Sequence, residues 1–106
     1  MIIRLYEENE IHKCTTCGLI VRVTFAAVPI EPLRCCDQDM ELIGIQENDE
    51  GLDLTPAPVV DGAKEHIYYP GELYNCSICG LDVTILREAR PVAALDCCGE
   101  GMELRG

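Results

Sequence analysis

The chain has 106 residues, which is room for one ordinary domain or for two very small ones. Eight cysteines in so short a chain indicate either a disulfide framework or metal binding. The net charge of −11, from 19 acidic and 8 basic residues, repels phosphate backbones and anionic lipids, so we expect no nucleic acid and no membrane among the partners.

The beginning of the chain, residues 1–8, carries acids where a signal peptide would have its apolar core. The longest apolar stretches, such as Phe25–Ile30, are far too short to span a bilayer. We therefore expect a soluble, cytoplasmic protein whose thiols stay reduced, which favours metal binding over disulfides.

The predicted elements are all strands. Short extended pieces are expected around Ile2–Tyr6, Ile11–Lys13 and Met40–Ile43, and the alternating apolar residues Leu19, Val21 and Val23 predict a longer strand. No stretch shows a helical apolar stripe with caps, so almost no helix is expected.

Residues 45–65 contain polar runs and Pro and Gly turn signals, which are typical of a linker. We expect a flexible coil here, and the simplest interpretation of the acidic run Glu47–Glu50 is a solvated part of this linker. The alternative is that this run docks to a basic partner.

The segment 66–106 repeats residues 4–44 without a gap, at an offset of 62. All eight cysteines fall in matched pairs, and so do Tyr6 with Tyr68 and Gly18 with Gly80. The sequence therefore predicts one small fold used twice: module 1 in residues 1–44, a linker in 45–65, and module 2 in 66–106.

Each copy contains Cys-x-x-Cys-Gly-Leu, then 17 residues after the second cysteine, then an adjacent Cys-Cys pair. Two local pairs of thiolates are what a tetrahedral four-cysteine site requires, and the glycine after each Cys-x-x-Cys can take positive φ and turn backbone N–H groups toward the sulfurs. The sequence predicts two such metal sites, and their ligands are Cys14, Cys17, Cys35 and Cys36 in one, and Cys76, Cys79, Cys97 and Cys98 in the other.

Two alternatives are weaker. Adjacent cysteines are poor disulfide partners for each other, and no βαβ pattern surrounds either Cys-x-x-Cys to suggest a thioredoxin-like redox motif.

The combination of Cys-x-x-Cys-Gly with a later Cys-Cys-Gly-Glu-x-Met resembles desulforedoxin and the similar N-terminal domain of desulfoferrodoxin. Cys76–Gly80 and Cys97–Met102 carry the resemblance best, and Tyr74 also fits. Module 1 departs from the pattern because Asp37 stands where module 2 has Gly99, which puts the fine geometry of the first site in question.

The resemblance implies a small metal-bound all-β protein, in which two tandem rubredoxin-like, desulforedoxin-like modules dock as a covalent pseudo-dimer. Such small modules bury little core alone, so metal should contribute to folding. The two histidines of the chain cannot supply the four that the iron site of a superoxide reductase needs, so the catalytic domain of desulfoferrodoxin is absent from this sequence.

Three further residue types have simpler interpretations. His12 corresponds to Tyr74 and His66 to Arg4, so an exposed or packing role is favoured for both histidines. Met40 and Met102 are expected in the core, because four thiolates already fill a tetrahedral site.

Two functions remain open. In the first, each site holds iron, and the protein carries single electrons to or from a redox enzyme with a basic docking surface. In the second, each site holds zinc, and the chain is a structural or adaptor module, such as a small subunit of a larger complex. The resemblance favours iron, and neither interpretation makes the protein an enzyme, because a closed four-thiolate shell leaves no open coordination position.

Overall fold

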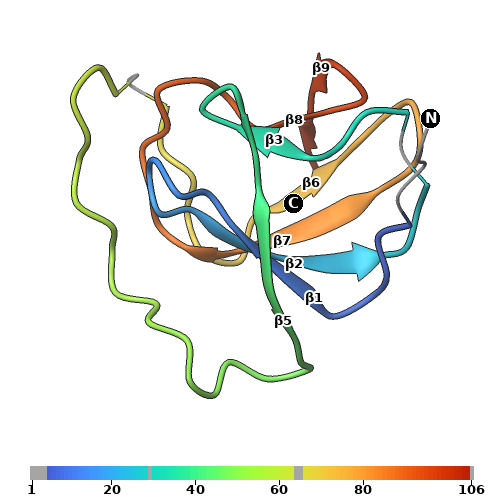
Figure 1. Cartoon of the computed structure of the whole chain (residues 1–106), viewed down its shortest axis with the longest axis horizontal. Helices are drawn as coiled ribbons and strands as arrows, with labels where there is room; N and C mark the ends of the chain where they lie inside the picture. The colour runs from blue at the N-terminus through green and yellow to red at the C-terminus, as the bar shows by residue number, and fades with distance from the viewer. Residues whose placement is uncertain (1–4, 29, 64–65, 106) are drawn as a thin grey trace.

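The computed structural model describes residues 5–28, 30–63 and 66–105, and within them the fold contains strands and no helix, so none that could cross a bilayer (Figure 1). The ten strands are β1 (Glu10–Lys13), β2 (Ile20–Phe25), β3 (Arg34–Cys35), β4 (Gln38–Asp39), β5 (Glu41–Ile45), β6 (Leu73–Asn75), β7 (Asp82–Arg87), β8 (Asp96–Cys97), β9 (Glu100–Gly101) and β10 (Glu103–Leu104). Most of the piece expected around Ile2–Tyr6 lies outside the described residues, but Tyr6 forms an isolated antiparallel bridge with Ala27.

The strands form two sheets, and each sheet contains both copies of the repeat. One sheet has the order β10-β6-β7-β2-β1-β5 and the other β4-β3-β8-β9. Both orders are symmetric about a central pair that joins the copies, which is β2 with β7 in the first sheet and β3 with β8 in the second. The predicted pseudo-dimer of two small rubredoxin-like modules is therefore confirmed, and the modules are joined by backbone pairing.

Both modules contribute to one core. The alternating residues predicted for the two long strands are buried on the same side of the sheet: Leu19, Val21, Val23, Leu81, Val83 and Ile85. They pack in a single cluster with residues of both Cys-Cys pairs. Because each small module buries the apolar face of the other, the pseudo-dimer obtains a core that one copy alone would lack.

The segment between the modules is partly packed. Residues 47–50 are exposed, as predicted for a solvated acidic run. Leu52 and Leu54, in contrast, pack on the outer face of the sheet against Ile11, Ile20 and Leu86. The expectation of a flexible coil is wrong for this part, because these three residues form an apolar strip that Leu52 and Leu54 cover. The module limits themselves stay a prediction.

Candidate metal centre

Each Cys-x-x-Cys pair lies in a tight loop before a long strand. The amide of Cys14 donates to the carbonyl of Leu19 at 2.8 Å, and the amide of Gly18 donates to the carbonyl of Cys14 at 2.9 Å. The loop of Cys76 and Gly80 repeats both bonds at the same distances. The predicted positive φ is confirmed at +83° for Gly18 and +84° for Gly80.

The amide that reaches a sulfur in this loop is that of Cys17, which donates to Cys14 Sγ at 3.5 Å. The glycine amide bonds to a carbonyl instead. The glycine closes the turn, and the residue before it supplies the donor to the thiolate.

Each Cys-Cys pair lies at the tip of a β-hairpin whose loop has two residues. Cys35 pairs with Gln38, and the two residues between them, Cys36 and Asp37, have φ of +57° and +59°. In the other copy Cys98 and Gly99 have φ of +57° and +77°. Positive φ at both central residues is the requirement of a type I′ turn, and this turn places two consecutive sulfurs at the tip of the hairpin.

Asp37 therefore adopts the left-handed conformation in which the other copy has a glycine. Aspartate tolerates this region better than most residues. The ligand arrangement is the same in both copies, so the departure from the family pattern leaves the geometry of the first cluster unchanged.

A tyrosine in each copy fixes the segment before the Cys-Cys pair. The hydroxyl of Tyr6 accepts a hydrogen bond from the amide of Leu33 at 3.0 Å, and the hydroxyl of Tyr68 accepts one from Leu95 at 2.9 Å. The tyrosine rings are buried in the shared core. They tie the core to the hairpins that carry the cysteines.

Next to each tyrosine, the two modules share a similar arrangement of side chains, in which His12 of module 1 corresponds to Tyr74 of module 2. His12 is fully buried, its Nε2 is 3.0 Å from Glu10 Oε1, and its ring meets Tyr6 edge to face. Tyr74 donates to Glu72 in the same way at 3.2 Å and meets Tyr68 edge to face. The packing role predicted for His12 is confirmed. His66 is exposed beside Tyr68.

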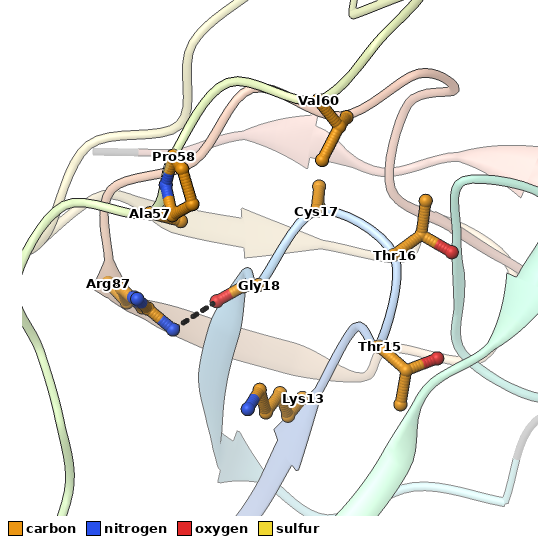
Figure 2. A pocket seen from close by; sticks show the side chains of 9 residues that line it. All are labelled: Lys13, Thr15, Thr16, Cys17, Gly18, Ala57, Pro58, Val60 and Arg87. Atoms are coloured by element: carbon orange, nitrogen blue, oxygen red, sulfur yellow. Dashed lines mark hydrogen bonds between the residues drawn. The ribbon is translucent and has the colours of Figure 1, made fainter.

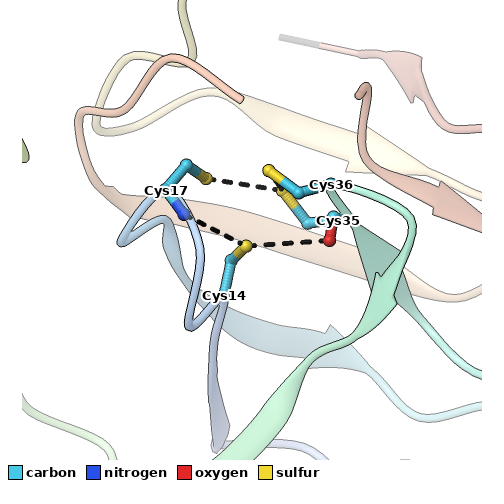
Figure 3. A group of neighbouring side chains, drawn as sticks. All are labelled: Cys14, Cys17, Cys35 and Cys36. Carbon is cyan, nitrogen blue, oxygen red and sulfur yellow. Dashed lines mark hydrogen bonds between the residues drawn. The ribbon is translucent and has the colours of Figure 1, made fainter. Parts of the chain in front are cut away.

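The structure brings the eight cysteines into two groups of four, and their role as metal ligands stays a prediction. The sulfurs of Cys14, Cys17, Cys35 and Cys36, here called the first cluster, all lie within 4.8 Å of one another, and so do those of the second cluster, Cys76, Cys79, Cys97 and Cys98. Figure 3 shows the first cluster, in which the loop of Cys14 and Cys17 faces the hairpin of Cys35 and Cys36.

The sulfur spacing fits a metal ion. Four thiolates at about 2.3 Å from a central ion are about 3.8 Å apart in a tetrahedron. Cys17 Sγ and Cys35 Sγ are 3.6 Å apart and those of Cys35 and Cys36 are 3.8 Å apart, and the second cluster repeats both values. All eight cysteines are free. The clusters therefore suit two mononuclear metal ions, one in each module.

Without a metal, hydrogen bonds between the sulfurs and burial shift the pKa values of several thiols. Hydrogen bonds from Cys17 and Cys35 lower the pKa of the Cys14 thiol, and the bond to Cys14 raises the pKa of Cys35. In the second cluster burial raises the pKa of Cys97, and it raises that of Cys79 to about 11. A metal must therefore displace protons when it binds.

The two clusters exchange hydrogen bonds across the pseudo-dimer. The amide of Val92 in the second module donates to Cys36 Sγ at 3.3 Å, and the amide of Ile30 in the first module donates to Cys98 Sγ at 3.3 Å. In the metal-free cluster, burial acts to raise the pKa of Cys98, but backbone donors from Glu31 and Ile30 give a net lowering. Each module thus stabilises a thiolate of the other, which sequence spacing did not reveal.

The clusters differ in their exposure to solvent. All four cysteines of the first cluster are buried, whereas Cys79 and Cys98 of the second are half-buried. Figure 2 shows the cover of Cys17: Ala57, Pro58 and Val60 of the joining segment lie over Cys17 and Gly18. We call residues 52–60 the capping segment.

Arg87 anchors the capping segment. Its Nε donates to the carbonyl of Thr55 at 2.7 Å, its Nη1 reaches the carbonyl of Gly18 at 3.5 Å, and the neighbouring Glu88 carbonyl accepts from the amide of Ala57 at 3.0 Å. The apolar residues Leu52, Leu54 and Ala57, which follow the polar run 46–51, were the sequence signal for this cap.

The methionines lie outside the sulfur shells. Met40 is buried in the core and Met102 packs against it, as predicted. Their amides donate to the carbonyls of Leu33 and Leu95, which closes each hairpin.

In a comparison with known families, residues 6–43 match the model described as the desulfoferrodoxin N-terminal domain. The comparisons with curated proteins and with solved structures gave no match. The resemblance inferred from the motifs is therefore confirmed for module 1, and the second four-cysteine cluster is consistent with a tandem repeat of it. The family match and the two clusters together indicate a metal-binding protein.

Proposed function

We propose, from the match of module 1 to the desulfoferrodoxin N-terminal domain and the two closed clusters, that this protein is a one-electron carrier with one iron ion in each cluster. The ligands are Cys14, Cys17, Cys35 and Cys36 in the first cluster, and Cys76, Cys79, Cys97 and Cys98 in the second. The family match is the observation that favours iron over zinc. The protein is a carrier and not an enzyme, since four thiolates leave no position for a substrate.

Bound iron would supply a single reversible electron, which adds one negative charge to the cluster on reduction. The chain's own contribution is to accommodate that charge. The amides of Cys17, Ile30 and Val92 point at the thiolates and stabilise the more negative state. The shared core buries the four cysteines of the first cluster and so keeps water from their sulfurs, which keeps the reorganisation on electron transfer small there.

The partner is proposed to be a redox protein with a basic docking surface, because the chain carries a net charge of −11. The eight free thiols suit the reducing conditions of the cytoplasm, which we propose as its location. Nucleic acids and membranes are not expected among its partners, because the same charge repels them.

The alternative is a zinc-bound structural or adaptor module. One observation supports it: each cluster ties a hairpin to a loop in a chain with a small core, which is how structural zinc sites stabilise small folds.

Metal analysis and a visible spectrum of protein purified from its native host distinguish the two functions. Iron should appear at two ions per chain, with thiolate-to-iron absorption that a one-electron reductant bleaches reversibly. Colourless native protein with stoichiometric zinc would refute the carrier function and leave the structural one.

A further inference from the structure

The capping segment covers only one half of the pseudo-symmetric sheet. On the first half, Leu52 and Leu54 lie on Ile11, Ile20 and Leu86. The positions equivalent to these three on the second half, at the offset of 62, are Leu73, Asp82 and Thr24. These three residues, together with Arg105, line a cavity of about 270 Å³. The cavity is thus the uncovered counterpart of the strip that the joining segment fills.

The two halves of the sheet also differ in how well they are covered next to the cysteine clusters. On the first half the capping segment reaches Cys17 and lines one pocket together with Thr16. On the second half the equivalent of Thr16 is Ile78, which is 44% exposed beside half-buried Cys79. Phe25, which pairs with Asp82, is 57% exposed. A Cβ placed on Gly80 meets nothing within 4 Å, whereas one on Gly18 meets Ala57 at 3.0 Å.

The two halves also differ in the charges that surround this segment. Asp53 of the capping segment has a lowered pKa, first through hydrogen bonds from Thr55 and then through the charges of Arg87 and Lys13. The equivalents of Arg87 and Lys13 on the second half are Phe25 and Asn75, which carry no charge, and Asp82 replaces Ile20 there. An acidic residue at the position of Asp53 would therefore lose both cations and meet Asp82 on the second half, where Arg105 is the basic residue among those that line the cavity.

We infer that the second half of the sheet is a docking groove for an extended segment of a partner protein that carries a basic residue between apolar ones. The segment lies across Leu73 and Asp82 and ends over Ile78 and Cys79, in the place that the capping segment fills on the first half. The basic residue faces Asp82, and the apolar residues contact Leu73, Phe25 and Ile78.

The groove gives the partner access to one cluster only. Cys79 is the half-buried ligand next to it, whereas Cys17 lies under the cap. The purpose of the docking, electron transfer through Cys79, rests on the proposed function. The binding itself does not, because it depends only on the shape and charge of the groove.

The test uses the full chain loaded with zinc, so that binding is measured without redox chemistry. The probe is a blocked synthetic peptide with the sequence of residues 51–60 carrying Asp53→Lys, followed by amide NMR of the labelled protein. We expect saturable shifts at residues 73–82 and at Phe25, and none at residues 14–18. The same peptide with its native Asp53 should bind at least about fivefold more weakly, since one favourable charge contact is lost and one unfavourable contact is gained.

Two variants at equivalent positions provide the matched control. Ile78→Lys places a like charge and removes an apolar contact in the groove, so it should weaken peptide binding at least about fivefold. Thr16→Lys makes the same change in net charge at the capped half and should change binding less than about twofold.

Three outcomes would overturn the inference: no saturable binding at millimolar peptide, equal shifts on both halves, or sedimentation showing a dimer that Ile78→Lys dissociates and Thr16→Lys does not. If the groove binds the peptide but the native metal is zinc, the carrier function fails and the docking site stands. If iron cycles but the peptide does not bind, the reverse holds.

Discussion

Replacing Gly18 with alanine should destabilise the metal-loaded protein by about 2 kcal/mol, about twice the effect of the same change at Gly80. Both glycines close equivalent loops, with φ of +83° and +84° and the same hydrogen bond to the first cysteine of the loop. The pair therefore separates the effect of the backbone conformation from the effect of the capping segment.

The backbone contribution is common to both positions. A left-handed conformation costs an alanine about 1–2 kcal/mol, and the stiffer unfolded chain returns about 0.4–1 kcal/mol, so the net loss is about 1 kcal/mol. At Gly80 nothing else changes, because no atom lies within 4 Å of the new methyl group.

The capping contribution is present only at Gly18. Its new methyl group would lie 3.0 Å from Ala57 Cβ and 3.3 Å from Arg87 Nη1. Carbon atoms prefer a separation of about 3.5–4.0 Å, so the capping segment must shift by at least about half an ångström. Because the segment lies at the surface and can move, we expect a cost near the lower end of overpacking, about 1 kcal/mol.

Urea unfolding of the zinc-loaded protein at a fixed free zinc concentration measures both variants against the parent. A chelator-driven release rate provides a second readout, which should rise for Gly18→Ala as the first cluster loses its cover and stay near the parental value for Gly80→Ala. Equal losses of stability at the two positions would show that the capping segment is not held against Gly18 and would refute the reasoning.

Three further predictions concern the turns, the metal and the protons. Asp37→Gly should stabilise the protein by up to about 1 kcal/mol in thermal unfolding, because it removes the strain of a non-glycine residue in the left-handed conformation. Gly99→Asp should destabilise the protein by about 1–2 kcal/mol for the opposite reason. Effects of the same sign for the two variants would contradict the turn assignment. Removing the metal, or Cys97→Ser, should reduce amide dispersion most in residues 66–105 and also across the shared β2–β7 pair, and an unchanged NMR spectrum would make the metal incidental to the fold. Because the pKa of Cys35 and of Cys97 is raised above the ordinary 9.0, these thiols keep their protons at neutral pH, so apparent zinc affinity in a chelator competition should fall as pH falls from 9 to 6; a flat profile would mean that binding displaces no protons.

The thiols with raised pKa values also contribute to the pH dependence of the free energy of unfolding when no metal is bound. When the pKa of a thiol is higher in the folded state than in the unfolded state, folding stabilises its protonated form. The resulting contribution to the free energy of unfolding is therefore complete below the unfolded pKa of 9.0. For Cys79 that contribution is lost as pH rises from 9.0 to about 11.

The sequence by itself determined the local architecture of the clusters. The Cys-x-x-Cys-Gly spacing predicted a tight loop with a left-handed glycine, and the alternation of Leu19, Val21 and Val23 predicted which face of the strand is buried. Both follow from the conformations of a few consecutive residues. Because the sequence repeats at an offset of 62, each prediction for module 1 also applied to the equivalent residues of module 2.

The tertiary structure decided what distinguishes the two copies. The amides of Ile30 and Val92 reach sulfurs 68 and 56 residues away in the chain, through pairing between the modules that no local pattern specifies. The two equivalent surfaces differ by Arg87 against Phe25 and by Ile20 against Asp82, and the pairing of β2 with β7 brings these residues together at opposite ends of the central strands. Spacing fixes the shape of a loop, but contacts between distant residues determine which cluster is covered and which remains open to solvent.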